Sequence, residues 1–156
     1  MVEIKNYIDG KLVKSINKET IDIFSPSNGQ VFACCPNSIT PDLDCAIKSG
    51  KKALNFWSNL PQNDRSEYLD RIADLIESKL DEFSYAETLD NGKPLKLSRS
   101  LDIPRAIQNL KFFANCAKEG KKEIYQKGRI NNEIVRKPLG LIGTISPWNL
   151  PLYLFT

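Results

Sequence analysis

The sequence predicts an α/β protein, and three features of the chain carry that prediction. Residues 2–36 alternate in the manner of short strands, residues 40–117 repeat apolar side chains with helical spacing, and an almost continuous apolar run spans residues 139–146. With 156 residues, of which 41% are hydrophobic, the chain is long enough for one domain with its own core.

Two hairpins are expected in the opening segment. In "YIDGKLV" the Asp9-Gly10 pair separates two strand-like runs, and in "IDIFSPSNGQVFACC" the Asn28-Gly29 pair does the same. Such pairs favour the tight turns of hairpins, because these residue types tolerate the positive φ angles that the turns require. The cysteines at the end of the second hairpin are therefore interpreted as strand residues rather than reactive thiols.

The first helix is predicted after Thr40, which we expect to be the N-cap, with Pro41 at the first helical position. Apolar residues then recur with helical spacing and form one stripe that we expect to be buried. The stripe comprises Leu43, Ala46, Ile47, Gly50, Leu54 and Trp57.

A second helical segment is predicted after Pro61, with a bend between two apolar patterns. The first pattern is Leu69, Ile72, Ala73, Ile76 and Leu80, and the second is Phe83, Ala86 and Leu89. The Asn91-Gly92 pair supplies a left-handed stop, with Pro94 just beyond it. The charged residues around this stop, Glu87, Asp90 and Lys93, are interpreted as a helix end and not as a functional cluster.

A third helix is predicted to start near Asp102 and Pro104 and to end at Gly120. Its stripe is interpreted as core: Ile103, Ala106, Ile107, Leu110, Phe113, Ala114 and Ala117. Residues 124–136 then alternate weakly and predict a solvent-facing hairpin. The apolar run at 139–146 is typical of a parallel strand buried on both faces, and Pro151 marks the start of a further helix.

Composition argues against several classes of function. The net charge of +3 is spread along the chain, which does not favour nucleic-acid binding. The chain has no histidine, and its four cysteines form no C-x-x-C pair, so no metal site and no histidine-dependent catalysis are predicted. The amino terminus lacks the apolar core of a signal peptide, and prolines and glycines interrupt the uncharged residues 138–156. We therefore expect a cytoplasmic protein with free thiols and no membrane segment.

The stretch "RKPLGLIGTISPWNLPLY" resembles a segment of the NAD(P)-dependent aldehyde dehydrogenase superfamily with the pattern P-x-G-x-x-x-x-I-x-P-W-N-x-P. The stretches "IDGKLV", "SPSNGQVFACCP", "AIKSGKKALNFWSNLPQNDRSEYLDRIADLIE" and "ETLDNGKPL" follow the order of the same family, so that the resemblance covers essentially the whole chain. Within the family, "NLPLY" and "DIPRAIQNLKFFA" are most similar to the branch that acts on a kynurenine-pathway semialdehyde.

This resemblance implies the amino-terminal part of the aldehyde dehydrogenase fold, apparently truncated. Residues 1–123 would be the first part of the NAD-binding domain, and residues 124–136 an oligomerisation-type hairpin. Residues 137–156 would be the first strand of the Rossmann-like core and the incomplete start of its helix.

The resemblance also implies a chemistry, in which an aldehyde is oxidised to a carboxylic acid through a thiohemiacetal. It places Asn149 as the oxyanion stabiliser and the backbone of Ile145, Ser146, Pro147 and Trp148 against the cofactor, which is NAD, with NADP left open. The nucleophilic cysteine and the general-base glutamate of the family lie outside this chain. From the residues alone, Pro147 to Asn149 could equally be a turn whose indole fills the core and whose asparagine caps the next helix.

Two hypotheses about function stay open. In the first, the chain is part of an aldehyde dehydrogenase that forms a homodimer or homotetramer when full length. In the second, it is a genuine short chain without catalysis that acts as an oligomerisation or regulatory module. The sequence ends at Leu152 to Thr156, inside the first turns of a predicted helix, which favours the first hypothesis.

Overall fold

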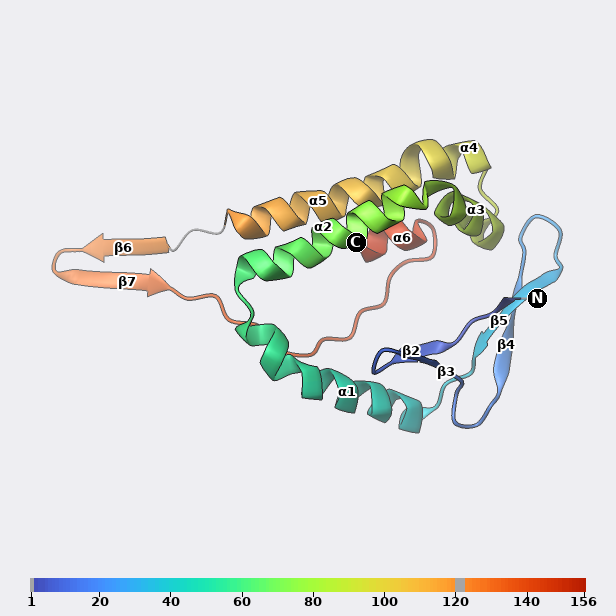
Figure 1. Ribbon diagram of the computed structural model, residues 1–156, viewed down its shortest axis with the longest axis horizontal. Helices are drawn as coiled ribbons and strands as arrows, with labels where there is room; N and C mark the ends of the chain where they lie inside the picture. Colours follow the sequence, from blue (N-terminus) through green and yellow to red (C-terminus); the bar gives the residue numbers. More distant parts are fainter. Residues whose placement is uncertain (1, 120–122) are drawn as a thin grey trace.

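The computed structural model describes residues 2–119 and 123–156, so that Gly120, the predicted end of the third helix, lies outside the described residues. Helices α2 (Gln62–Ser78) and α5 (Ile103–Lys118) lie side by side, and α1 (Thr40–Asn59) lies apart from them (Figure 1). Small sheets occupy the amino-terminal end, and a hairpin projects from the opposite end. The predicted α/β class is confirmed.

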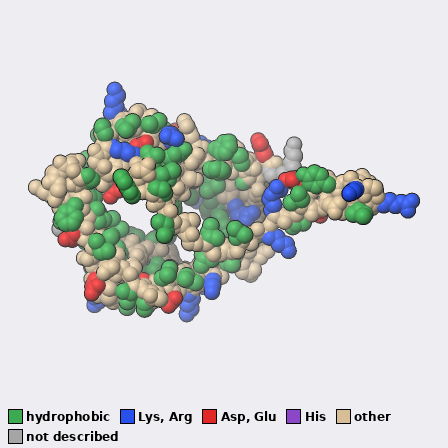
Figure 2. All heavy atoms as spheres, turned by 180° about the vertical axis from the view of Figure 1, so that it is seen from behind, with side chains coloured by type: hydrophobic (Ala, Val, Ile, Leu, Met, Phe, Trp, Pro, Cys, Tyr) green, Lys and Arg blue, Asp and Glu red, His purple; other side chains and the backbone are tan. Residues whose placement is uncertain are grey.

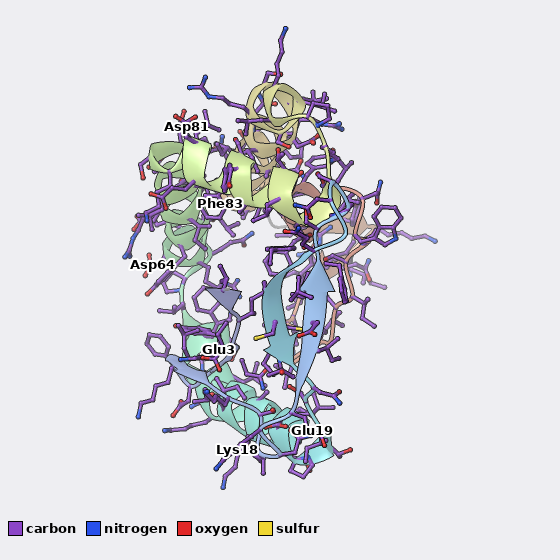
Figure 3. The ribbon with its side chains drawn as sticks, turned by 90° about the vertical axis from the view of Figure 1, so that its right-hand side faces the viewer. Glu3, Lys18, Glu19, Asp64, Asp81 and Phe83 are labelled. Atoms are coloured by element: carbon purple, nitrogen blue, oxygen red, sulfur yellow. The ribbon has the colours of Figure 1, made fainter. Side chains whose placement is uncertain are left out.

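The amino-terminal strands form two small sheets. A three-stranded sheet has the order β1-β5-β4, in which β5 runs parallel to β1 and antiparallel to β4, and β2 pairs with β3 in a separate hairpin. The strands are β1 (Val2–Glu3), β2 (Asn6–Ile8), β3 (Lys11–Val13), β4 (Thr20–Phe24) and β5 (Val31–Pro36). Viewed from this end, β4 and β5 span the distance between α1 and the helices above it (Figure 3).

Both predicted hairpins are confirmed. Asp9 and Gly10 have φ angles of 52° and 74°, the pair of positive values that the first turn requires. Gly29 has a φ of 67° in the second hairpin, and the register of that hairpin shifts between Ile23 and Phe24. These local turns need no distant partner to form.

Helix α1 differs from its prediction in two respects. Its N-cap is Ile39 rather than Thr40, because the buried carboxylate of Asp42 accepts a hydrogen bond from the Ile39 backbone N–H at 2.9 Å. The predicted stripe is not buried: Leu43 and Trp57 are exposed, and Asp42 is the buried residue of the helix. Figure 2 shows openings through the molecule, so that its side chains do not pack into one continuous core.

The core lies between α2 and α5. Ala73, Ile76, Ile103, Ile107 and Leu110 form a buried cluster, and Leu69, Leu80 and Phe83 pack against it. Three residues of the predicted apolar patterns, Ile72, Ala86 and Phe113, are instead exposed, so that the buried faces are narrower than predicted.

The predicted bend and stop are confirmed. Helix α2 ends at Ser78, α3 (Leu80–Asn91) begins after Lys79, and Gly92 caps α3 with a φ of 77°. A short helix α4 (Leu95–Leu97) and a π-helical turn η1 (Ser98–Asp102) then lead directly into α5, so that helical structure begins before the predicted start at Asp102.

The carboxyl-terminal part contains one confirmed and one wrong prediction. Strands β6 (Glu123–Lys127) and β7 (Ile130–Ile134) form the predicted exposed antiparallel hairpin. Residues 139–146 form no strand, since no strand among the described residues lies beside them to complete a sheet. Helix α6 (Pro151–Phe155) begins at the predicted proline. In the described ranges, no helix is long and apolar enough to cross a bilayer.

Candidate functional site

The five residues of the predicted site lie where the extended segment ends and α6 begins. Trp148 and Asn149 occupy a turn, and Leu150 is the N-cap of α6. Asn149 is exposed, and its side-chain amide makes no hydrogen bond with any residue in the described ranges. The amide group is therefore available to a ligand.

Helix α6 is anchored to α5, which fixes the turn that precedes it (Figure 1). Leu152 packs against the core cluster between α2 and α5. The Arg105 guanidinium lies 4.1 Å from the centre of the Tyr153 ring, and its Nη2 donates a hydrogen bond to the Tyr153 hydroxyl at 3.0 Å. A helix as short as α6 is not stable by itself, so these contacts hold it in place.

An open pocket of about 450 Å³ separates α3 from the turn and α6. Ser146, Pro147 and Trp148 form part of its wall on one side, and Glu87 and Asp90 of α3 line the other. Three of the four residues predicted to lie along the cofactor therefore share one pocket. Ile145 is not among its lining residues and is fully exposed.

The alternative interpretation of the same residues is only partly correct. Pro147 to Asn149 do form a turn, but Trp148 is 81% exposed and fills no core. Asn149 does not cap α6, because Leu150 occupies the N-cap position without a side-chain hydrogen bond. The roles of Asn149 and of residues 145–148 remain predictions that the geometry permits.

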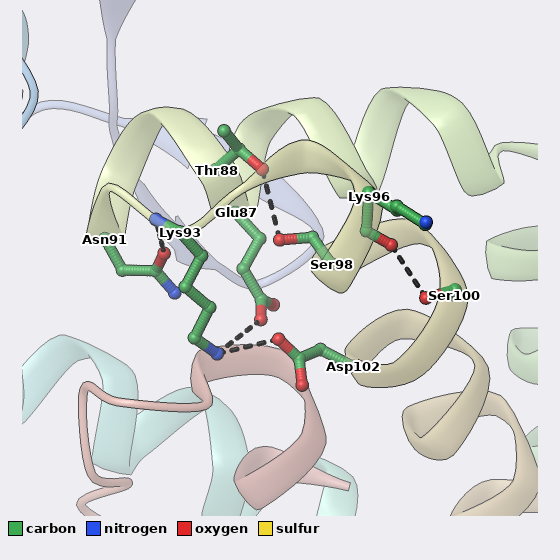
Figure 4. Close-up of polar contacts among 8 residues, drawn as sticks. All are labelled: Glu87, Thr88, Asn91, Lys93, Lys96, Ser98, Ser100 and Asp102. Carbon is green, nitrogen blue, oxygen red and sulfur yellow. Dashed lines mark hydrogen bonds and ion pairs between the residues drawn. The ribbon is translucent and has the colours of Figure 1, made fainter.

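A buried charged cluster lies beside this pocket, where the sequence predicted only a helix end (Figure 4). The Lys93 Nζ lies 2.7 Å from Oδ2 of Asp102 and 3.5 Å from Oε1 of Glu87. Glu87 and Asp102 are only 6% and 1% exposed. We call Glu87, Lys93 and Asp102 the buried triad.

Burial raises the pKa of Glu87, and this effect is the largest acting on the group. The positive charge of Lys93 lowers the pKa, the negative charge of Asp102 raises it, and hydrogen bonds from Lys93 and the Leu152 backbone lower it. Glu87 thus pairs with Lys93 and lines the same pocket as Leu152 of α6. Sequence analysis missed this arrangement because Asp102 reaches Lys93 only through the π-helical turn η1, for which the chain carries no local signal.

Similarity to known proteins decides the family. The sequence profile of the Aldehyde dehydrogenase family matches residues 12–156. The chain belongs to this family. This result confirms the resemblance of the motifs around Asn149, and it places the turn and α6 within a matched region.

Relatives of this chain include proteins named as muconic semialdehyde dehydrogenases. The 2-aminomuconic semialdehyde dehydrogenase of Homo sapiens is 40% identical, and the alignment covers 100% of this chain and 32% of that protein. The 2-hydroxymuconic semialdehyde dehydrogenase of Pseudomonas sp. strain CF600 is 41% identical, with 100% and 33% covered. The chain thus spans about a third of the length of these relatives.

Solved structures of the family share the fold of this chain. PnpE, from Pseudomonas sp. WBC-3, in complex with nicotinamide adenine dinucleotide superposes with a TM-score of 0.92 at 32% identity, covering 97% of this chain and 31% of that one. The P. syringae indole-3-acetaldehyde dehydrogenase in complex with NAD+ and IAA gives a TM-score of 0.93 at 28% identity, with 99% and 32% covered. Both of these structures hold NAD.

Proposed function

We propose that the chain is the amino-terminal part of an NAD-dependent aldehyde dehydrogenase that oxidises a muconic-type semialdehyde to the carboxylic acid. The observation that carries this proposal is the exposed Asn149, whose amide has no partner within the described residues and which directly precedes the anchored helix α6. The names of the relatives from Homo sapiens and Pseudomonas support the substrate class. NADP is the alternative cofactor.

Asn149 would act on the negative charge that develops when the aldehyde carbonyl becomes tetrahedral. Its side-chain NH₂ donates hydrogen bonds, and a donor fixed before the reaction stabilises an oxyanion without having to reorganise. The contacts of Leu152 and Tyr153 with α5 supply that fixation. The nucleophile and the general base would come from residues beyond this chain.

The turn and the residues before it offer free backbone groups to a dinucleotide. Within the described ranges, residues 145–149 make no backbone–backbone hydrogen bond, so that their C=O groups, and the N–H groups of all but Pro147, are open to a ligand. NAD, when bound, supplies the hydride acceptor. Ser146, Pro147 and Trp148 would form the protein wall along it, on the side of the pocket opposite α3.

The β6–β7 hairpin favours a second role, which is self-association. It projects from the rest of the molecule (Figure 1), and Ile124, Ile130 and Ile134 are exposed on it. Exposed apolar side chains on a paired ribbon are typical of an interface. We propose a cytoplasmic homodimer or homotetramer built with this hairpin, and a short non-catalytic chain would use the same surface to bind full-length subunits.

The first test is the intact mass of the protein in its source cells, captured with an antibody against residues 1–119. A mass about three times 17.7 kDa is expected, since the chain spans 32% of its human relative. A mass of 17.7 kDa would contradict the catalytic proposal and support the short, non-catalytic module. We refer below to the whole polypeptide identified in this way as the intact protein.

The second test replaces Asn149 in the intact protein. Asn149→Asp should lower kcat by about 10²–10³ and leave the KM for the aldehyde nearly unchanged, because a carboxylate repels the developing oxyanion and donates no hydrogen bond. Asn63→Asp makes the same chemical change at an exposed position of α2 and should leave NADH production unaltered. An unchanged kcat in Asn149→Asp would dispose of the oxyanion role.

A further inference from the structure

The chain contains two Asn-Gly pairs, Asn28-Gly29 and Asn91-Gly92, and neither lines the pocket between α3 and α6. The first pair lies in the turn between β4 and β5, and the second ends α3. Both glycines have a positive φ angle, of 67° and 77°. The same dipeptide therefore occurs twice in similar backbone conformations, and any difference in its chemistry comes from the surroundings.

The side chains of the two asparagines make the same local hydrogen bond. Oδ1 of Asn28 accepts from the Gln30 backbone N–H at 2.9 Å. Oδ1 of Asn91 accepts from the Lys93 backbone N–H at 3.0 Å (Figure 4). A hydrogen bond to Oδ1 draws electron density from the side-chain carbonyl carbon, so both carbons are open to a nucleophile to a similar degree.

An asparagine that precedes a glycine loses its side-chain nitrogen without an enzyme. Hydroxide removes the proton of the glycine N–H, and the backbone nitrogen attacks the side-chain carbonyl carbon. The new N–C bond closes a succinimide ring, while the C–N bond to the side-chain NH₂ breaks and this nitrogen leaves as ammonia with a proton from water. Water then opens the ring at one of its two carbonyl groups, which gives aspartate or isoaspartate. Glycine permits the attack because it has no Cβ in the way.

The surroundings of Asn28 allow this attack. Asn28 and Gly29 are exposed, and a Cβ at Gly29 would meet nothing within 4 Å among the described residues. The Gly29 N–H donates to the Ser25 carbonyl at 2.8 Å, which is a bond inside the turn itself. A surface turn opens locally at little cost in free energy, so the Gly29 nitrogen becomes available while the rest of the protein stays folded.

The surroundings of Asn91 oppose the attack. Its Nδ2 is buried and has no hydrogen-bond partner in the part of the chain that the structure describes. The Gly92 N–H donates to the Thr88 carbonyl at 3.0 Å and closes the last turn of α3. Gly92 also lies against the β4–β5 turn, because an added Cβ would be 3.2 Å from Cβ of Pro26. Attack at Asn91 therefore requires the end of α3 to open, and the ammonia would leave from a buried position.

We infer that Asn28 is a site of spontaneous deamidation, whereas the packing at the end of α3 protects Asn91 from the same reaction. This inference does not depend on the proposed function of Asn149. The β4–β5 turn lies at the end of α3 (Figure 1), so the modification occurs where the amino-terminal sheet meets the helices. Isoaspartate carries the backbone through the side chain and lengthens this turn, which loosens its contact with Gly92.

The first measurement follows both sites in the folded intact protein. The protein is kept in mildly alkaline buffer, and peptide mass spectrometry detects the replacement of a side-chain NH₂ by OH. Asn28 should convert at least about tenfold faster than Asn91, because only the exposed turn opens locally. No conversion at Asn28, or equal rates at the two sites, would overturn the inference.

Unfolding separates the effect of the structure from the reactivity of the dipeptide. In concentrated urea the two sites should convert at similar rates, since both lose their surroundings. If Asn91 stays slower than Asn28 by the same factor, its protection comes from the adjacent sequence and the structural explanation is wrong.

Asn28→Gln is the matched variant, because it keeps an amide whose longer side chain forms the corresponding larger ring much more slowly. Its peptide should keep its mass in the folded protein. A mass gain at the wild-type rate would assign the reaction to another residue of the peptide and not to Asn28.

The last measurement tests the contact with α3. The isoaspartate form, separated by chromatography, should show faster hydrogen exchange at the Gly92 amide than the unconverted protein. The Leu110 amide, in the core between α2 and α5, should be unchanged. Asn28→Asp adds the charge without the longer backbone and should exchange at Gly92 as the wild type does. Unchanged exchange at Gly92 in the isoaspartate form, or equally fast exchange in Asn28→Asp, would overturn the structural consequence of a longer turn.

Discussion

Helix α5 and residues 139–146 are both rich in large apolar residues, but in α5 one face of these side chains is buried, whereas in residues 139–146 they are exposed. Ile103, at the start of α5, is completely buried, whereas Leu139 is 94% exposed and Ile145 fully so. The difference is not one of composition but of partners. Helix α5 packs on α2, which belongs to the same stretch of chain, whereas the apolar run has no strand beside it within the described residues.

This contrast shows what apolar sequence does and does not specify. A helix satisfies its own backbone hydrogen bonds and needs only one apolar face covered, so that two neighbouring helices suffice. A parallel strand needs neighbouring strands for its backbone groups and covering layers for both faces. The α2–α5 pair is therefore complete in this chain, and the region around residues 139–149 is not.

The largest expected effect comes from replacing one large apolar side chain by alanine in each of the two regions. Ile103→Ala should lower the free energy of opening of the α2–α5 pair by about 2–5 kcal/mol, since it leaves a cavity in a closed core. Leu139→Ala removes an exposed side chain and should change it by less than about 0.5 kcal/mol. Hydrogen exchange of α2 and α5 amides measures both, and similar losses in the two variants would contradict the contrast.

The sequence was sufficient wherever an element depends on its own residues. The turn at Asp9-Gly10, the stop at Gly92 and the start of α6 at Pro151 are all set by local conformational preferences, and all three are correct. The narrow core between α2 and α5 also follows from helical spacing, although Ile72 and Phe113 were assigned to it wrongly.

The sequence was insufficient wherever an element depends on distant neighbours. Residues 139–146 carry the pattern of a buried strand, but a pattern cannot show whether the neighbouring strands are present. Likewise, Glu87 and Lys93 were interpreted as a helix end, because nothing local indicates that Asp102 folds back on Lys93 through a π-helical turn. For the candidate site, motif similarity predicts a role for Asn149, whereas the contacts of Leu152 and Tyr153 that anchor the following helix are visible only in the structure.

A smaller effect should come from the pH dependence of stability at Glu87, the buried glutamate of the triad. Because burial raises the pKa of Glu87 above its ordinary value of 4.5, the folded state favours the protonated form. The stability that protonated Glu87 contributes to the folded state is fully present below pH 4.5. It is lost as the pH rises through the raised pKa of Glu87. Lys93 pairs with Glu87, Asp102 pairs with Lys93, and Asp90 lines the same pocket as Glu87, so these three are the charged groups around it.

The Glu87→Gln variant isolates that contribution. Between about pH 4 and pH 7, the opening free energy of α3 and α5 in the wild type should fall relative to the variant, as measured by hydrogen exchange corrected for the pH dependence of intrinsic rates. Glu77→Gln, at an exposed carboxylate of α2, supplies the background slope. A difference between wild type and Glu87→Gln that stays constant with pH would show that the burial of Glu87 has no such consequence.

The smallest effect concerns the contact of the extended segment with α1. A Cβ at Gly50 would lie 2.7 Å from Cδ1 of Leu141, but that atom ends a flexible, half-exposed side chain that is able to turn away. Alanine is favoured over glycine inside a helix by up to about 1 kcal/mol. Gly50→Ala should therefore stabilise α1 by less than about 1 kcal/mol, as measured by exchange of α1 amides, while Gly143→Ala, which meets nothing within 4 Å, should leave α1 unchanged. A clear loss of α1 protection in Gly50→Ala would mean that residues 139–143 are held against α1 more firmly than their exposure indicates, and that the contrast between the two regions is smaller than the structure implies.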